Sequence, residues 1–485
     1  MSDMLLFRPG GDIGGWQYGQ WGLLDAWLRE KPELWLTKKA YSPVKLPDKA
    51  IEKPQKGLPL AIPVQNRFNH TNLSEIRFAW KIASGGHSET EPSAGDCMGP
   101  NTAPGFLGVL LLPERDYHAG DVVEIRIFDR QDQEIDFYQL EILDAETPRA
   151  GKRTSAQPHS PVTLAQSGDE AVITGERFRI VFSARTGLLK TAVYDGKQLL
   201  CGGPYLNLHG AFYKGTVFQN DQNGEFSVAP SGFRCTAFHA EETAGEALVT
   251  ISGEYPGGSQ SDAWGFLHQY EPVRVRFAVR VTGDGVLHTG FTVENPPPAF
   301  LYEVGVSYLL PDDLSGIQWK KEAVYSGYPA DHIGRPEGRA ILHQAAGVDA
   351  YRVKPVWRWS ADETNFPLYG SSDGGHHGTN DFIATRENIY FYSCLTPGDI
   401  RHVRVESDGR SLAVRICPAW NEDKDLPECL KLSMNTELYY DLGGGSSAII
   451  KSGDGYMGNY VVPEIHLTGP YTAEVMLRLT DEPDR

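Results

Sequence analysis

Apolar and polar residues alternate over many short stretches of this chain, and this feature limits its possible folds more than any other. In residues 274–281, three arginines lie on one side of the pattern and apolar residues lie on the other. A period of two is that of a β-strand with one face in a protein core. The pattern recurs in further stretches that we expect to be strands, at residues 60–64, 75–82, 108–112, 122–128 and 177–182.

Turn-forming residues separate these stretches. The chain contains 52 glycines and 32 prolines among its 485 residues, and it has few long helical periodicities. The dipeptide of Asp195 and Gly196 is a strong signal for a tight turn between antiparallel strands, because glycine adopts a positive φ at little cost. We therefore predict an all-β chain of many short strands.

The length of the chain predicts about three domains. Pro148, Pro158 and Pro161 interrupt regular structure over a charged stretch rich in serine and threonine, which is typical of a linker. The strands before it are spaced as in a β-sandwich. We predict a first segment at residues 1–44, a sandwich at 45–145, a linker at 146–170 and a larger β domain at 171–485.

The charge balance excludes one class of partner. Lys and Arg number 45 against 63 Asp and Glu, which gives a formal net charge of −18. We expect no nucleic-acid partner, because binding to a phosphate backbone needs a positive surface. No apolar run reaches membrane-spanning length and no leader pattern begins the chain, so we expect no membrane partner and a cytoplasmic protein. The six cysteines are widely spaced, which favours reduced thiols.

Aromatic residues are unusually dense near the beginning of the chain. A glycine-rich stretch carries Trp16, Tyr18 and Trp21, which are candidate carbohydrate contacts because aromatic faces stack on the apolar faces of sugars. The alternative is that these rings belong to an ordinary core. Nothing before them in the sequence shelters them, so we expect a covering surface from another chain or from a further part of the protein.

Three regions of the chain resemble parts of one enzyme family. Residues 18–25, 31–33 and 37–43 resemble the end of the catalytic barrel in β-galactosidase-like members of glycoside hydrolase family two. Residues 66–75 resemble the start of a strand in that family's second sandwich. The region after residue 171 resembles its large C-terminal sandwich, which belongs to the galactose-mutarotase-like superfamily.

This resemblance implies a fold and a function. It implies a short TIM-barrel remnant at 1–44, an immunoglobulin-like sandwich at 45–145 and a mutarotase-like supersandwich at 171–485. Both catalytic glutamates of the family lie upstream of the matching stretches, so the chain resembles a non-catalytic portion or subunit of a β-galactosidase-like enzyme. The implied partners are carbohydrate, a missing or separate barrel chain and a possible second copy. Family magnesium and sodium ligands lie mostly in that barrel, so we expect no metal and no cofactor here.

Two loops carry further candidate residues. The stretch 325–338 is rich in proline and glycine, and its polar residues are either a contact with the barrel or a structural ion pair. The stretch 373–382 holds His376 and His377, but too few further ligands for a metal. We expect interface or loop-positioning roles for Tyr328, Asp331, His332, Arg335, Asn380 and Asp381.

A third loop is a candidate sugar contact. Tyr456 follows Gly453-Asp454-Gly455. In the family, the corresponding loop of the final sandwich places an aromatic ring, usually tryptophan, beneath the sugar. The resemblance therefore implies that Tyr456 is a carbohydrate contact.

Other hypotheses remain open for acids and histidines in the larger domain. Glu303, Glu322 and Glu337 are candidate acids, although each is expected to be solvated or paired with a cation. The mutarotase-like fold offers a second chemistry, in which a glutamate base and a histidine acid act on a free sugar. The histidines on predicted strands there are His209, His268 and His288, and a structural role is the alternative for each. The rival functions are therefore a carbohydrate-binding protein and a sugar epimerase.

Overall fold

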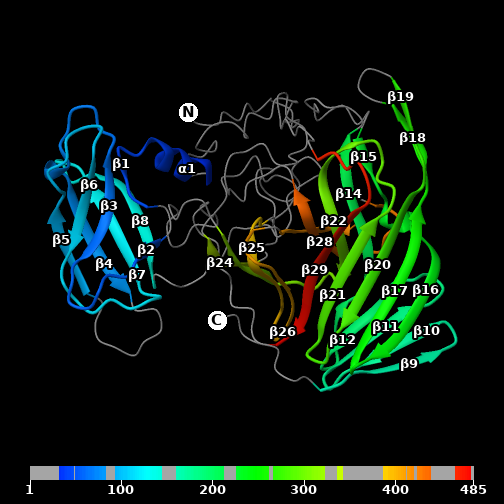
Figure 1. Cartoon of the computed structure of the whole chain (residues 1–485). Helices are drawn as coiled ribbons and strands as arrows, with labels where there is room; N and C mark the ends of the chain where they lie inside the picture. Colours follow the sequence, from blue (N-terminus) through cyan, green and yellow to red (C-terminus); the bar gives the residue numbers. More distant parts are fainter. Residues whose placement is uncertain are drawn as a thin grey trace, which may run out of the picture. The chain divides into compact units, whose positions relative to one another are not determined.

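The prediction of an all-β chain is confirmed. The computed structural model describes residues 32–47, 50–83, 93–144, 160–211, 225–261, 266–322, 336–341, 386–410, 412–419, 423–438 and 465–481. Among these residues, α1 (Pro32–Tyr41) is the one α-helix, and 3-10 turns occur at η2 (Leu73–Glu75) and η3 (Pro230–Gly232). The described residues fall into two compact units, 32–144 and 160–481 (Figure 1).

The first unit contains two sheets. One has the strand order β1-β3-β6 and the other the order β2-β8-β7-β4-β5. All pairings are antiparallel except that of β2 with β8. The strands are β1 (Val44–Lys45), β2 (Ala50–Glu52), β3 (Leu60–Asn66), β4 (Arg77–Ala83), β5 (Ser93–Met98), β6 (Leu107–Leu112), β7 (Val122–Phe128) and β8 (Glu134–Leu143).

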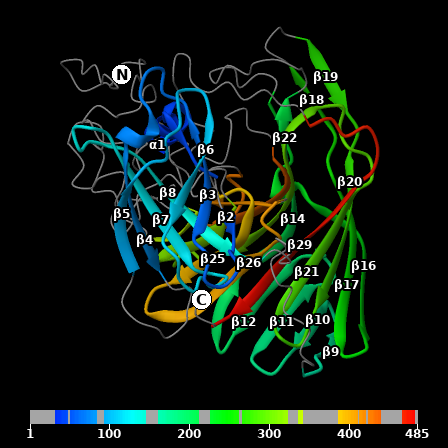
Figure 2. The same ribbon diagram turned by 60° about the vertical axis from the view of Figure 1, so that its left-hand side comes forward.

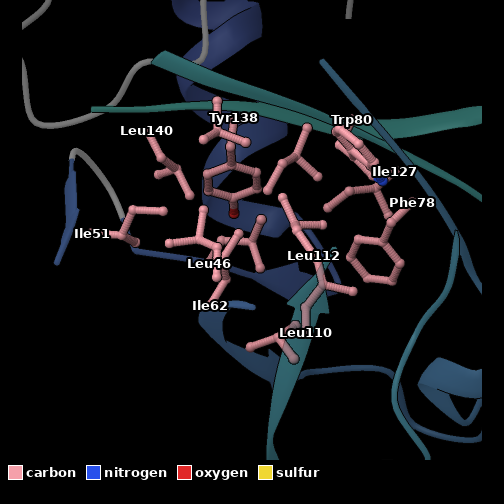
Figure 3. Close-up of a cluster of buried hydrophobic side chains, with 14 of the residues drawn as sticks. Leu46, Ile51, Ile62, Phe78, Trp80, Leu110, Leu112, Ile127, Tyr138 and Leu140 are labelled. Carbon is pink, nitrogen blue, oxygen red and sulfur yellow. The ribbon is translucent and has the colours of Figure 1, made fainter. Parts of the chain in front are cut away.

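Alternate residues of these strands form one core. Ile62 from one sheet and Phe78, Trp80 and Tyr138 from the other are buried in the same cluster (Figure 3). The intervening residues of β3 are exposed, which is the alternation that predicted the strand. The unit is therefore a two-sheet sandwich.

Helix α1 and strand β1 belong to this sandwich unit. Val44 is fully buried in the sandwich core, and β1 pairs with β3. Lys39 on α1 places its Nζ 2.6 Å from Asp136 Oδ1, and both side chains are almost completely buried. The first segment predicted from the sequence ends at residue 44. In the structure that residue lies in β1. Residues 32–44 are thus part of the sandwich.

The polar stretch before β4 forms a capped turn. Asn72 caps η2, because its Oδ1 accepts a hydrogen bond from the Ser74 backbone N–H at 3.0 Å. Glu75 Oε1 in return accepts from the Asn72 N–H at 2.9 Å. This reciprocal pair is a capping box, and it precedes β4.

The second unit contains four sheets. Their strand orders are β13-β12-β11-β10-β9, β15-β14-β22-β28-β27, β16-β17-β20-β21-β29-β26-β25-β23-β24 and β18-β19. The strands are β9 (Thr163–Ser167), β10 (Glu170–Thr174), β11 (Phe178–Ser183), β12 (Leu189–Tyr194), β13 (Lys197–Leu200), β14 (Gly202–Ala211), β15 (Glu225–Ser227), β16 (Arg234–Thr243), β17 (Glu246–Tyr255), β18 (Gly258–Ser261), β19 (Leu267–Tyr270), β20 (Val273–Val281), β21 (Val286–Val293), β22 (Phe300–Leu310), β23 (Gly316–Lys321), β24 (Glu337–Ile341), β25 (Ile389–Thr396), β26 (Asp399–Glu406), β27 (Ala413–Pro418), β28 (Leu430–Leu438) and β29 (Tyr471–Thr480).

Strand β9 lies in a range that the sequence assigns to the linker. Residues 163–167 pair with β10 in an antiparallel ladder. The last proline of the predicted linker, Pro161, precedes this strand, so no residue within it lacks a backbone donor. The linker as predicted from sequence therefore extends too far. The predicted turn after β12 is present, with positive φ at both Asp195 and Gly196.

The sheet that contains β22 packs one of its faces on the nine-stranded sheet. The hydroxyls of Tyr308 on β22 and Thr289 on β21 are 2.8 Å apart and fully buried. The Tyr255 hydroxyl of β17 accepts a hydrogen bond from the Leu206 N–H of β14 at 2.8 Å. In Figures 1 and 2, β20, β21 and β29 run side by side in the larger sheet. The even-numbered residues of β22 thus face the core between two sheets.

Candidate functional site

Most candidate site residues from the sequence lie outside the described part of the chain. For these the expected interface, loop-positioning and sugar-contact roles stay predictions, as does the expectation that His376 and His377 hold no metal. They are Trp16, Tyr18, Trp21, Tyr328, Asp331, His332, Arg335, His376, His377, Asn380, Asp381 and Tyr456.

The described residues bring together a different set of polar side chains. Side chains at every second position of β14, β22, β28 and β27 lie on the face of their sheet opposite to the apolar face. We call this surface the polar face. It is formed by Asn207, His209, Glu303, Ser307, Arg415, Lys431, Ser433 and Asn435.

Asn207 lies at the centre of a hydrogen-bond network on the polar face. Its Nδ2 donates to Glu303 Oε2 at 2.9 Å and to Asn435 Oδ1 at 2.6 Å. Its Oδ1 accepts from Lys431 Nζ at 2.7 Å. The residues Asn207, Asn435, Glu303 and Lys431 are all at most 5% exposed. Burying so many polar groups is costly unless each is hydrogen-bonded, which explains the density of the network.

The partners of Asn207 also determine which nitrogen of His209 carries a proton. A carboxylate only accepts and an ammonium only donates, so the amide orientation of Asn207 is fixed by Glu303 and Lys431. Its Oδ1 is 3.2 Å from His209 Nε2. Because Oδ1 is an acceptor, Nε2 donates and therefore carries a hydrogen. His209 thus presents an N–H at the edge of the network.

His209 and Glu303 are opposite residues of the neighbouring antiparallel strands β14 and β22. The Cβ atoms of such a pair are about 5 Å apart, so both side chains can reach one small ligand. His209 is only half-buried, whereas Glu303 is 5% exposed. The pair therefore combines a proton donor near solvent with a buried carboxylate.

Arg415 reaches Glu303 from two strands away. Its Nη2 donates to Glu303 Oε2 at 3.1 Å, and the side chains are 13% and 6% exposed. Strand β28 lies between β27 and β22, so the guanidinium crosses a whole strand. A charged hydrogen bond in a poorly hydrated place is strong, and it fixes the direction in which the carboxylate points. The expectation that Glu303 is paired with a cation is confirmed.

Tyr205 adds a phenol to the same face. It is the strand partner of Ser307 and is 7% exposed. Burial raises the pKa of Tyr205 to about 12, and the nearby Cys429 and Cys201 add to the effect. Its hydroxyl therefore stays protonated at neutral pH, and Tyr205 is excluded as a base.

The other candidates from the sequence lie elsewhere in the second unit. Glu337 forms an ion pair with Lys320 at 3.1 Å, with both side chains about half exposed. Glu322 Oε2 accepts a hydrogen bond from the Tyr390 hydroxyl at 2.6 Å. His268 lies on the hairpin strand β19, and His288 lies on β21 beside Glu474. These residues do not meet on the polar face.

Sequence reasoning missed four members of the network. They are Asn207, Arg415, Lys431 and Asn435. A signal was present, because polar residues at every second position of an otherwise apolar strand mark a distinct face. The sequence suggests that such a face is solvated, and only the tertiary structure shows that it is buried.

Within the described ranges, no group of three or more His, Cys, Asp and Glu residues could hold a metal ion. In the same ranges no helix has the length and apolar character to cross a membrane.

Comparisons with known proteins do not identify a function for the chain. No family model and no curated protein matches the chain. Among solved structures, the galactose 1-epimerase from Lactobacillus acidophilus NCFM is similar with a TM-score of 0.28 and 10% identity, over 66% of this chain and 98% of that chain. None of these findings supports the resemblance to glycoside hydrolase family two. The case for a function therefore rests on the side chains of the polar face.

Proposed function

We propose that residues 160–481 bind a free aldose against the polar face and interconvert its two anomers. Glu303 is the general base and His209 is the general acid. The observation that carries the proposal is the direct opposition of these two residues within a buried network of amide, ammonium and guanidinium groups.

Stability alone gives no reason for this network. Replacing a buried ion pair by apolar residues of similar volume is often neutral or stabilising. The ion pair of Glu303 with Arg415 and the amides beside it are, however, the groups that hydrogen-bond to sugar hydroxyls. A binding role therefore explains their burial better than a structural one.

Interconversion of the anomers needs one base at the anomeric hydroxyl and one acid at the ring oxygen. The Glu303 carboxylate takes the proton of the anomeric hydroxyl while the protonated His209 imidazole gives a proton to the ring oxygen. The bond between the anomeric carbon and the ring oxygen breaks, and an open-chain aldehyde forms. Rotation of the aldehyde followed by the reverse proton transfers closes the other anomer. Atoms and protons balance, and no cofactor is required.

Optical rotation tests this proposal. Freshly dissolved α-D-galactose and α-D-glucose are mixed with the purified chain, and the approach to anomeric equilibrium is compared with the spontaneous rate. We expect faster relaxation to an unchanged equilibrium value. The matched control is Glu337→Gln, because Glu337 is an exposed, ion-paired glutamate. Relaxation at the spontaneous rate with wild-type protein, for both sugars, contradicts the proposal.

A second candidate is a carbohydrate-binding portion of a β-galactosidase-like glycoside hydrolase. It is favoured by the family-like stretches at residues 18–25 and 66–75. On this proposal the purified chain alone does not hydrolyse aryl β-galactosides, because a retaining glycosidase needs two carboxyl groups about 5 Å apart and the family glutamates lie upstream of the matching stretches. Hydrolysis by the purified chain, free of other enzymes, would refute it.

A further inference from the structure

Two serine residues on the polar face are completely buried. Ser307 on β22 and Ser433 on β28 are opposite residues of neighbouring strands, and both are 0% exposed. Neither Oγ atom has a hydrogen-bond partner among the described residues. A buried hydroxyl without a partner lowers stability, and such groups are rare in native proteins. The pair therefore needs an explanation beyond packing.

Ser307 lies on the same strand and the same face as Glu303. Ser307 is four residues after Glu303 on the same face of β22, which corresponds to about 13 Å along the strand. One pyranose ring with a hydrogen bond at each end bridges such a distance. Gly305 lies midway, and the side chains of its two strand neighbours, Asn207 and Asn435, hydrogen-bond to each other at 2.6 Å. A sugar that has its anomeric carbon at Glu303 and displaces this amide pair directs the opposite side of its ring toward the serines.

Lys431 spans this part of the polar face and is itself 1% exposed. It begins on β28 beside Ser433 and reaches Asn207 on β14, so its side chain crosses β22 near Ser307. A ligand must displace the ammonium group from above the serines. Because an ammonium group has three donors, Lys431 can hydrogen-bond to a ligand hydroxyl after it moves.

We propose that Ser307 and Ser433 determine specificity by hydrogen-bonding to the C4 hydroxyl of the bound aldose, which lies opposite the anomeric carbon. This inference rests on the proposed function, since it assumes that a sugar binds with its anomeric carbon at Glu303. The serines act as a matched donor and acceptor for one hydroxyl, and their unsatisfied state is the ligand-free form of the site.

The test combines sugar binding with thermal unfolding. Dissociation constants of D-galactose and its 4-deoxy analogue are measured by calorimetry for the wild type, Ser307→Ala and Ser433→Ala. We expect each variant to bind galactose about tenfold more weakly and the 4-deoxy sugar as tightly as the wild type does. Without ligand, neither variant should melt at a lower temperature, because the hydroxyl removed had no partner in the structure.

Thr289→Val is the control, because it removes a buried hydroxyl that does have a partner, the Tyr308 hydroxyl at 2.8 Å. This variant should melt at a lower temperature and bind galactose normally. Serine variants that melt lower and keep the wild-type preference for galactose would show a structural role and overturn the inference. Equal affinity of the wild type for both sugars would also overturn it. Binding is measured without turnover, so binding of galactose without anomerisation would refute the proposed activity alone.

Discussion

His209 and Glu303 are directly opposite each other on strands β14 and β22, and one amide joins them. Asn207 holds the carboxylate of Glu303 with its nitrogen and faces the imidazole of His209 with its oxygen. The two titratable groups are therefore linked in position although they are far apart in sequence.

Glu303→Gln should lower kcat/KM for galactose anomerisation by about 10²- to 10⁴-fold, because it removes the base but retains the shape of the side chain. His209→Asn should have an effect of similar size. Polarimetry at neutral pH gives the rates, and circular dichroism verifies that each variant is folded. A rate within twofold of the wild type for either folded variant would exclude that residue from catalysis.

Asp136→Ala should destabilise the sandwich unit by about 3–5 kcal/mol, because it leaves Lys39 buried without its carboxylate partner. Lys56→Ala is the control, since the Lys56 ion pair with Asp116 is largely exposed and should contribute at most about 1 kcal/mol. Urea denaturation of both variants measures the difference. Similar losses of unfolding free energy in the two variants would show that the buried ion pair does not stabilise the unit more than the exposed one.

Gly305→Ala should disrupt the sheet at the polar face. An added Cβ would lie 2.0 Å from the Met434 carbonyl oxygen and 2.7 Å from the Asn435 Cα, and these backbone atoms cannot move aside independently. We expect a loss of at least about 1–3 kcal/mol. At Gly290 on β21, the nearest atom is 3.7 Å away, so Gly290→Ala should be tolerated. In thermal unfolding, Gly305→Ala should melt at a clearly lower temperature than Gly290→Ala.

The free energy of unfolding should decrease as the pH is lowered, and His288 should contribute to this decrease. Burial lowers the pKa of His288, and Arg280 on the neighbouring strand adds to the effect, although Glu474 opposes it. The unfolded chain then binds a proton more readily than the folded one. Stability is therefore retained above the unfolded-state pKa of about 6.5 and is lost as the pH falls below it.

The corresponding measurement is the free energy of unfolding of wild type and His288→Gln between pH 7.5 and 5. The variant should lose less stability over this range than the wild type. His239→Gln is the comparison, because the side chain of His239 is 68% exposed. An identical pH dependence for all three proteins would show that His288 does not contribute.

Local structure was predictable wherever neighbouring residues in sequence decide it. The alternating stretch 122–128 predicts β7 with the bounds that the structure has, and Asp195 with Gly196 predicts the turn after β12. Helix α1 shows the limit of such reasoning. Its attachment to the sandwich depends on Asp136, almost a hundred residues later in the sequence.

By itself, therefore, the sequence determined the strand content, the turns and the two-sheet sandwich, because period-two patterns and turn residues act over a few neighbouring positions. Only the tertiary structure decided that Asn207, Glu303, Arg415 and Lys431 meet. Their strands become neighbours through long-range pairing, which no local pattern encodes. The tertiary structure also buries this face, so its polar groups must hydrogen-bond to one another or to a ligand.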